Sequence, residues 1–144
     1  MAIPKRNPYD QYKQTEIGTA NQGKLIVMLY DGAIKFLNIA IEHMEPKTYD
    51  IVNNNIIKAQ DIINELLMSL NMNEGGQISQ NLFNLYMFFK KQLLEANIQK
   101  DAEMIKVVVK MLQDLREAWE KISAQEAKSD KIAPTTKGSF SIEG

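Results

Sequence analysis

The chain has 144 residues, a length that fits one domain. Its composition, with 44% hydrophobic and 24% charged residues, is typical of a soluble globular protein. A net charge of −1 without a long run of one sign gives nucleic acid no basic surface to bind. The absence of cysteine excludes disulfides and thiolate metal sites, and favours a reducing compartment. We see neither a signal peptide nor an apolar run of about 18 residues, so we expect a cytoplasmic protein without membrane insertion.

Residues 1–20 have no sustained periodicity, and Pro4 and Pro8 exclude a helix interior, so we predict a flexible N-terminal arm. The arm nevertheless carries apolar side chains, among them Tyr9 and Tyr12. Two interpretations stay open: a solvated arm, or an arm that docks on the folded part of the chain.

The stretch Lys24–Met44 predicts a first helix that is apolar almost all the way round, with six apolar residues in a row from Leu25 to Tyr30. Thr19 or Asn21 would cap its start, and the helix should end near Pro46 because proline disfavours helix in the residue before it. One neighbour cannot cover so much apolar surface. The helix must therefore be central in a bundle, or be covered by the chain's own ends, another copy or a partner.

Three further helices are expected at Tyr49 to about Leu70, Gln77–Asn97 and Ala102–Ala124, with Thr48 capping the first of them and Asp101 the last. Each carries an apolar stripe at spacings of three and four that we assign to the core. These stripes are Val52, Ile56, Ala59, Ile63, Leu66 and Leu70; Ile78, Leu82, Leu85, Phe89, Leu93 and Ala96; and Met104, Val108, Met111, Leu115, Ala118 and Ile122.

The last two helices carry a second apolar set that exceeds what a shared core needs. Its members are Phe83, Met87, Phe88 and Leu94, and Ile105, Val109, Leu112 and Trp119. No stretch alternates with period two, and the helices have similar lengths and short connections. We predict an all-α protein, an antiparallel up-down four-helix bundle over residues 21–124, followed by a disordered tail at 125–144.

Chemical motifs are weak. The segment from Gly18 to Leu25 resembles a phosphate-binding loop, but Leu25 replaces the required hydroxyl and no strand precedes it. His43, the single histidine, lies in a last helical turn, where it complements the helix C-terminus. We expect no catalytic residue, no metal and no cofactor. Asp31-Gly32 in mid-helix has two open interpretations, close helix packing or close approach of a partner backbone.

Ordered blocks across residues 7–122 resemble the FliS family of flagellar secretion chaperones. The first is Lys24-Leu25 with Met28-Leu29-Tyr30-Asp31-Gly32-Ala33-Ile34-Lys35-Phe36-Leu37. The others are Lys58–Leu66; Gly75-Gly76-Gln77-Ile78 with Asn81-Leu82 and Leu85-Tyr86; Leu93–Asn97; and Leu115–Trp119, with Asn7-Pro8-Tyr9 similar to the family's start. The chain departs from the family at Tyr86–Gln92, where Tyr-Met-Phe-Phe-Lys-Lys-Gln is more apolar and less basic than the usual stretch.

The resemblance implies a helical bundle that binds the disordered C-terminal part of flagellin in the cytoplasm. It implies that such a protein prevents premature polymerisation and presents flagellin to the export gate protein FlhA. It further implies that the N-terminal segment, here through Tyr9 and Tyr12, covers part of the groove when flagellin is absent.

We therefore predict a non-enzymatic export chaperone whose groove is built from off-core apolar residues. The groove candidates are Leu25, Met28, Phe83, Met87, Ile105 and Trp119. The alternative is a homo-oligomeric structural bundle, such as a homodimer, in which the extra stripes pack against a second copy.

Overall fold

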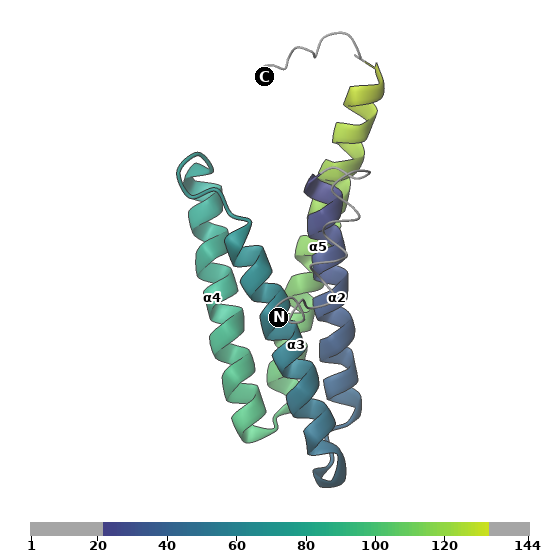
Figure 1. The fold of residues 1–144 in the computed structure, drawn as a ribbon, viewed down its shortest axis with the longest axis vertical. Coiled ribbons are helices and arrows are strands. Elements are labelled where there is room, and N and C mark those ends of the chain that lie inside the picture. Colours follow the sequence, from purple (N-terminus) through teal and green to yellow (C-terminus); the bar gives the residue numbers. More distant parts are fainter. Residues whose placement is uncertain (1–21, 133–144) are drawn as a thin grey trace, which may run out of the picture. The chain divides into compact units, whose positions relative to one another are not determined.

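The computed structural model describes residues 22–132, and the side chains of residues 22–125. Within this range the chain is all-α, with no strand, as predicted (Figure 1). Its elements are α2 (Gln22–Glu42), the 3-10 turn η2 (Pro46–Thr48), α3 (Tyr49–Met68), α4 (Gly76–Gln99) and α5 (Ala102–Ile132). The predicted arm, the caps Thr19 and Asn21, and most of the predicted tail lie outside the described residues.

The chain divides into two compact units. The larger, Ile26–Arg116, holds most of α2, all of α3 and α4, and the beginning of α5; successive helix segments within it run antiparallel, as the bundle prediction requires (Figure 1). The described part of the other unit consists of residues 22–25 and 117–132, in which Leu25 is 7% exposed and Trp119 is half-buried.

Helix α2 is central to the core of the larger unit. Tyr30, Ala33, Leu37 and Ala40 have no exposed surface, and Ile26, Val27 and Leu29 are at most 7% exposed. A helix that is apolar nearly all round is stable in water only when neighbours cover most of it. The sequence left open whether this helix is central in a bundle or is covered by the chain's ends, another copy or a partner. In the structure α2 is the central helix, and its neighbours cover most of its apolar surface.

The predicted core of α3 is confirmed, because Val52, Ile56, Ala59, Ile63 and Leu66 are all buried. In α4 the predicted Phe89, Leu93 and Ala96 are buried. One prediction for α4 is wrong, because Ile78 is 71% exposed, and one core residue was missed, because Tyr86, which no stripe included, is 1% exposed. The stripe therefore does not reach the loop end of α4, where Ser79 rather than Ile78 is buried.

In α5 the burial of the two apolar stripes differs in part from the prediction. Ile105, Val109 and Leu112, predicted outside the core, are at most 7% exposed, whereas Ala118 and Ile122, predicted inside it, are exposed. Val108 is buried as predicted. The stripes adjoin on the helix surface, and periodicity shows that each is a stripe without showing which of them meets the other helices.

The connection between α2 and α3 differs from the expected cap. Thr48 does not accept a bond from the first turn of α3; its Oγ1 donates to the carbonyl of His43 at 2.7 Å. The η2 turn begins at Pro46, whose fixed φ suits a first helical position. The His43 ring lies 2.9 Å from the Ile39 carbonyl through Nδ1, so this histidine interacts with the α2 C-terminus as predicted.

The two ends of α4 need unusual backbone. Gly76 has φ +60°, which favours glycine, and a Cβ on Gly75 would collide with the Ser79 side chain. At the other end Lys100 adopts φ 53°, and its Nζ donates to Asn53 Oδ1 of α3 at 2.9 Å. Asp101 accepts from the Glu103 N–H at 2.9 Å, which confirms its predicted role as the cap of α5.

Helix α5 continues to Ile132, so its predicted end at Ala124 is wrong. Residues 125–132 contain no proline or glycine and include Gln125, Glu126, Ala127 and Lys128, all good helix formers. The prediction ended the helix where the sequence becomes polar, but a polar composition does not by itself end a helix.

Candidate functional site

Ionisable side chains do not form a chemical centre in the part of the chain that the structure describes. No group of three or more His, Asp or Glu side chains there is placed to hold a metal ion, and no helix there is long and apolar enough to cross a membrane. Burial raises the pKa of the Tyr86 phenol, and its 2.5 Å hydrogen bond with the Tyr30 hydroxyl offsets part of that rise. This pair joins α2 to α4 inside the core.

Exposed apolar side chains are the more informative feature, and α4 supplies the largest share of them. On this helix Phe83 is 37%, Met87 43%, Leu94 58% and Ile98 69% exposed. Their spacings of four, seven and four place them on one line along the helix. Solvent-exposed apolar side chains are ordinary when scattered, but several of them aligned on one side of a helix make that side a candidate interaction surface.

Helix α3 extends this line into a broader surface. Ile57 is 54% and Met68 72% exposed, and with Asp61 and Asn64 between them they share one side of α3. Asn64 Oδ1 accepts from Lys90 Nζ at 2.8 Å, and Gln60 Nε2 donates to the Lys90 carbonyl at 3.1 Å. These two bonds set the helices side by side, so that the exposed lines of α3 and α4 adjoin.

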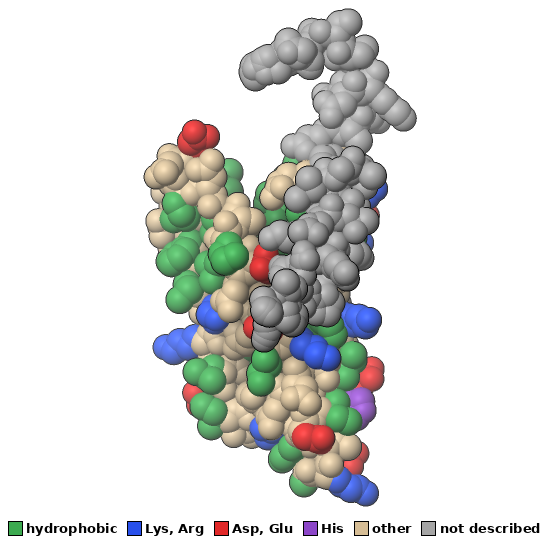
Figure 2. Space-filling view, viewed as in Figure 1, with side chains coloured by type: hydrophobic (Ala, Val, Ile, Leu, Met, Phe, Trp, Pro, Cys, Tyr) green, Lys and Arg blue, Asp and Glu red, His purple; other side chains and the backbone are tan. Residues whose placement is uncertain are grey.

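We call this surface the α3–α4 face. It comprises Ile57, Gln60, Asp61, Asn64 and Met68 of α3, and Phe83, Met87, Lys90, Leu94 and Ile98 of α4. Because the helices are antiparallel, Met68 lies at the same end as Phe83 and Met87, and Ile57 at the same end as Leu94 and Ile98. Figure 2 shows hydrophobic side chains gathered over α4 above and below a stretch with lysine.

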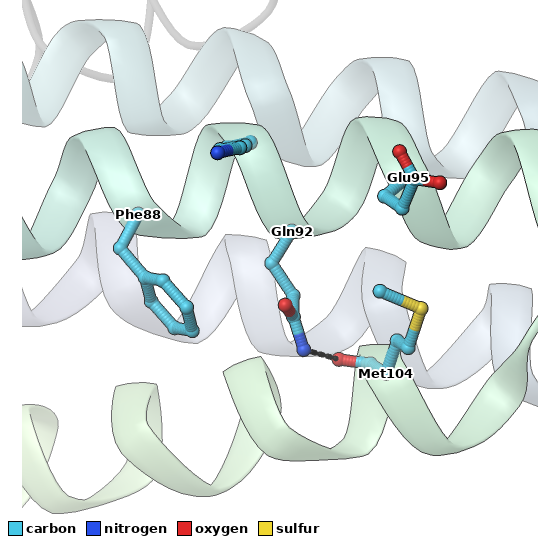
Figure 3. A pocket seen from close by; sticks show the side chains of 5 residues that line it. Phe88, Gln92, Glu95 and Met104 are labelled. Carbon is cyan, nitrogen blue, oxygen red and sulfur yellow. Dashed lines mark hydrogen bonds between the residues drawn. The ribbon is translucent and has the colours of Figure 1, made fainter.

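A pocket lies on the other side of α4, between α4 and α5. It encloses about 320 Å³ and is lined by Phe88, Lys91, Gln92, Glu95 and Met104. Gln92 Nε2 donates to the Met104 carbonyl at 3.3 Å, and the Phe88 ring points from α4 toward α5 (Figure 3). The lining is mixed in polarity, with Phe88 and Met104 beside Lys91, Gln92 and Glu95.

The structure separates the predicted groove residues into groups. Phe83 and Met87 lie together on the α3–α4 face, and Met28 is half-buried on α2. Ile105 has no exposed surface, so its assignment outside the core is wrong, and Leu25 is also buried. Trp119 is half-buried in the second unit. Tyr9 and Tyr12 lie outside the described residues.

The prediction missed four members of the α3–α4 face as site residues: Ile57, Met68, Leu94 and Ile98. Leu94 was placed in the surplus apolar set but not selected, whereas Ile98 stood in no stripe. Its spacing of 15 residues from Phe83, about four helical turns, was the available signal. Ile57 and Met68 were not selected because the sequence analysis assigned a single apolar stripe to α3, and neither residue belongs to it.

Comparison with known proteins decides the family. The family model described as flagellar protein FliS matches residues 5–126. The chain belongs to the FliS family. This result confirms the resemblance inferred from the sequence blocks, and the matched range contains both the α3–α4 face and the α4–α5 pocket.

Relatives from distant bacteria agree with the FliS assignment. The flagellar secretion chaperone FliS of Bacillus subtilis (strain 168) is 38% identical over 128 residues, which cover 89% of this chain and 93% of the relative. That of Salmonella typhimurium is 35% identical over 76% of this chain and 82% of its own. The Vibrio cholerae protein is 32% identical over 75% and 79%. All three are named as chaperones.

Proposed function

We propose that this FliS-family chain is a cytoplasmic, non-enzymatic chaperone of flagellar export. It binds the disordered C-terminal region of flagellin, keeps that region from polymerising prematurely, and delivers it to the export gate through FlhA. The names of the relatives support the chaperone class. That the client is flagellin is supported by the family resemblance and by the exposed apolar surface described above.

The observation that carries the proposal is the α3–α4 face. Its two helices hold their exposed apolar side chains side by side, within a unit whose core is already filled by α2 and its neighbours. These side chains therefore contribute little to folding. Their use is in binding, where an amphipathic client helix lays its apolar side on them and presents anchor residues at helical spacing.

The same arrangement explains how a chaperone holds a chain without folding it completely. A disordered client loses conformational entropy when it becomes ordered, so a large apolar contact has to compensate. Met68 and Met87 contribute unbranched side chains that adapt to different anchor shapes. Client residues held on the face are unavailable for contacts with other flagellin molecules, which is the physical basis of the block on polymerisation.

Calorimetric titration tests the proposal. The probe is a peptide of the C-terminal ~40 to 60 residues of flagellin from the same organism, long enough to bury the ~1,000–3,000 Å² expected of coupled folding and binding. A scrambled peptide of identical composition is the matched control. We expect saturable one-to-one binding of the native peptide with a negative heat-capacity change, and none of the scrambled peptide at the same concentrations.

Absence of binding by the native peptide contradicts the proposal, and equal binding of the scrambled peptide reduces it to nonspecific adhesion. The titration also addresses the homo-oligomeric alternative when it is combined with a mass measurement in dilute solution. A tight dimer without affinity for the peptide would favour that alternative.

A further inference from the structure

The middle of the α3–α4 face carries two opposite charges, one on each helix. Asp61 of α3 is exposed, and Lys90 of α4 is half-buried, with its Nζ donating to the neutral Asn64 Oδ1 at 2.8 Å. Among the residues that the structure describes, neither Asp61 nor Lys90 takes part in an ion pair. The neighbouring Lys91 lines the α4–α5 pocket together with Glu95. The middle of the face therefore has no net charge, but it presents one acid and one base to a partner.

These two charges lie at the same level of the antiparallel helices. Gln60 Nε2 donates to the Lys90 carbonyl at 3.1 Å, and Asn64 accepts from Lys90 Nζ, so Lys90 is level with the turn of α3 that contains Asp61. Toward both of its ends each helix has exposed apolar side chains. Along its exposed side each helix thus presents the same order of apolar, charged and apolar residues, with the sign of the charge reversed between the two.

A surface with this pattern is complementary to a second copy of itself. A two-fold axis that runs between the helices and parallel to them places α3 of each copy against α4 of the other, with the paired helices antiparallel. Asp61 of each copy then meets Lys90 of the other, and apolar ends meet apolar ends. An axis across the helices would instead place Asp61 against Asp61 and Lys90 against Lys90, which repel. The charges therefore select the first arrangement.

We propose that the α3–α4 face binds a second copy of this chain, with α3 of each copy on α4 of the other, and that this dimer is the form of the protein without a client. The dimer covers the same apolar side chains that a client helix needs, so each excludes the other. The face has far fewer residues than the ~20–30 on each side of a stable interface, so the association is weak and reversible. The competition rests on the proposed function, whereas the dimer itself does not.

The test exchanges the two charges in the full chain. The variants are Asp61→Lys, Lys90→Glu and the double variant that carries both changes. Glu42→Lys and Lys47→Glu are matched controls, since they make the same changes of charge at exposed positions outside the face. Sedimentation equilibrium at chain concentrations from about 10 µM to about 1 mM measures the dimer dissociation constant. Circular dichroism establishes that each variant folds.

We expect the unmodified chain to dimerise within this range. Each single variant should weaken the dimer about tenfold or more at low salt, because the two-fold axis places the new side chain opposite a like charge twice. An equimolar mixture of the two single variants should recover the association, since each then meets an opposite charge, and so should the double variant alone. The controls should leave the dissociation constant unchanged, and added salt should reduce the differences.

Three results overturn the inference. The first is a chain that stays monomeric at about 1 mM, and the second is a dimer that responds to neither single variant. The third is a loss in both single variants without recovery in the mixture or in the double variant, because the two charges are then not paired across the axis.

The flagellin C-terminal peptide then tests the competition. Saturating peptide should convert the dimer into one-to-one complexes of chain and peptide. A chain that stays dimeric with the peptide bound overturns the shared use of the face. Absence of any peptide binding contradicts the proposed function instead, and the charge exchange alone then decides the dimer.

Discussion

Helices α2 and α4 both carry more apolar residues than one core stripe needs, yet the structure uses the surplus differently. On α2 the surplus is enclosed, and Tyr30, Ala33 and Leu37 have no exposed surface. On α4 the core takes Tyr86, Phe89 and Leu93, and a second line stays in contact with solvent. Apolar excess on a helix therefore indicates function only where neighbouring helices leave it uncovered.

The largest effect we expect is a difference between two leucines. Leu37→Ala, in the enclosed part of α2, should lower the free energy of unfolding by about 2 to 5 kcal/mol, because it leaves a cavity. Leu94→Ala, at 58% exposure on α4, should change it by no more than about 0.5 kcal/mol. Urea denaturation followed by circular dichroism measures both. Similar losses would show that the exposed line of α4 belongs to the folded core.

A smaller effect concerns the hydroxyl pair that joins the two helices. Tyr86→Phe removes the hydrogen bond with Tyr30 and should cost about 1 kcal/mol of stability at neutral pH. Because burial raises the pKa of Tyr86 in the folded state, its contribution is present below the usual value of about 10 and is lost as pH rises above it.

Stability measured between pH 8 and 11 checks the sign. The unmodified chain should lose stability as pH rises beyond about 10, and Tyr86→Phe should lose less over the same interval. A variant that declines as steeply as the parent would show that other groups cause the alkaline loss. The comparison requires that the variant keep its helical content, which circular dichroism reports.

The exposed side of α2 provides a smaller effect still. Arg116 Nε of α5 donates to Asp31 Oδ1 at 2.5 Å, and the two side chains are 33% and 49% exposed. Solvent screens such a pair, so Asp31→Asn should cost about 0.2 to 1 kcal/mol and the cost should shrink in high salt. Thermal unfolding at two salt concentrations measures it. A larger, salt-independent loss would mean that Asp31 supports packing beside the ion pair.

The smallest effect concerns the N-terminal arm. If residues 1–16 compete with the client for an apolar surface, apparent affinity falls by the fraction of time that surface is open. Deleting these residues should therefore tighten flagellin-peptide binding or leave it unchanged, as measured by calorimetry. Clearly weaker binding would make the arm, with Tyr9 and Tyr12, part of the site itself.

The sequence predicted the helices and their order well because the period of three and four is a local property of each segment. It failed where the answer depends on what lies across a helix. Helix α5 is the clearest case: Ile105 and Leu112 are buried and Ala118 and Ile122 exposed, the reverse of the prediction, because two adjoining stripes have the same period. Tyr86 was missed because its place in the core depends on a partner 56 residues away.

The candidate site was predicted in part for the same reason. Phe83 and Met87 were recognised because their helix had a second apolar set beside a stripe already assigned to the core. Met68 and Ile57 were not, since each adjoins α4 only in the folded chain, through the contacts of Asn64 and Gln60 with Lys90. A surface shared by two helices has no signature in either helix alone.

The measurement that tests the central claim most directly compares two substitutions on one helix. Leu94→Ser lies on the α3–α4 face, whereas Ile78→Ser changes a side chain of similar size that is 71% exposed but lies off the face. Titration with the flagellin C-terminal peptide should show about tenfold weaker binding for Leu94→Ser, as for an interface anchor, and little change for Ile78→Ser. Equal effects of the two, or a loss only for Ile78→Ser, would contradict the assignment of the face.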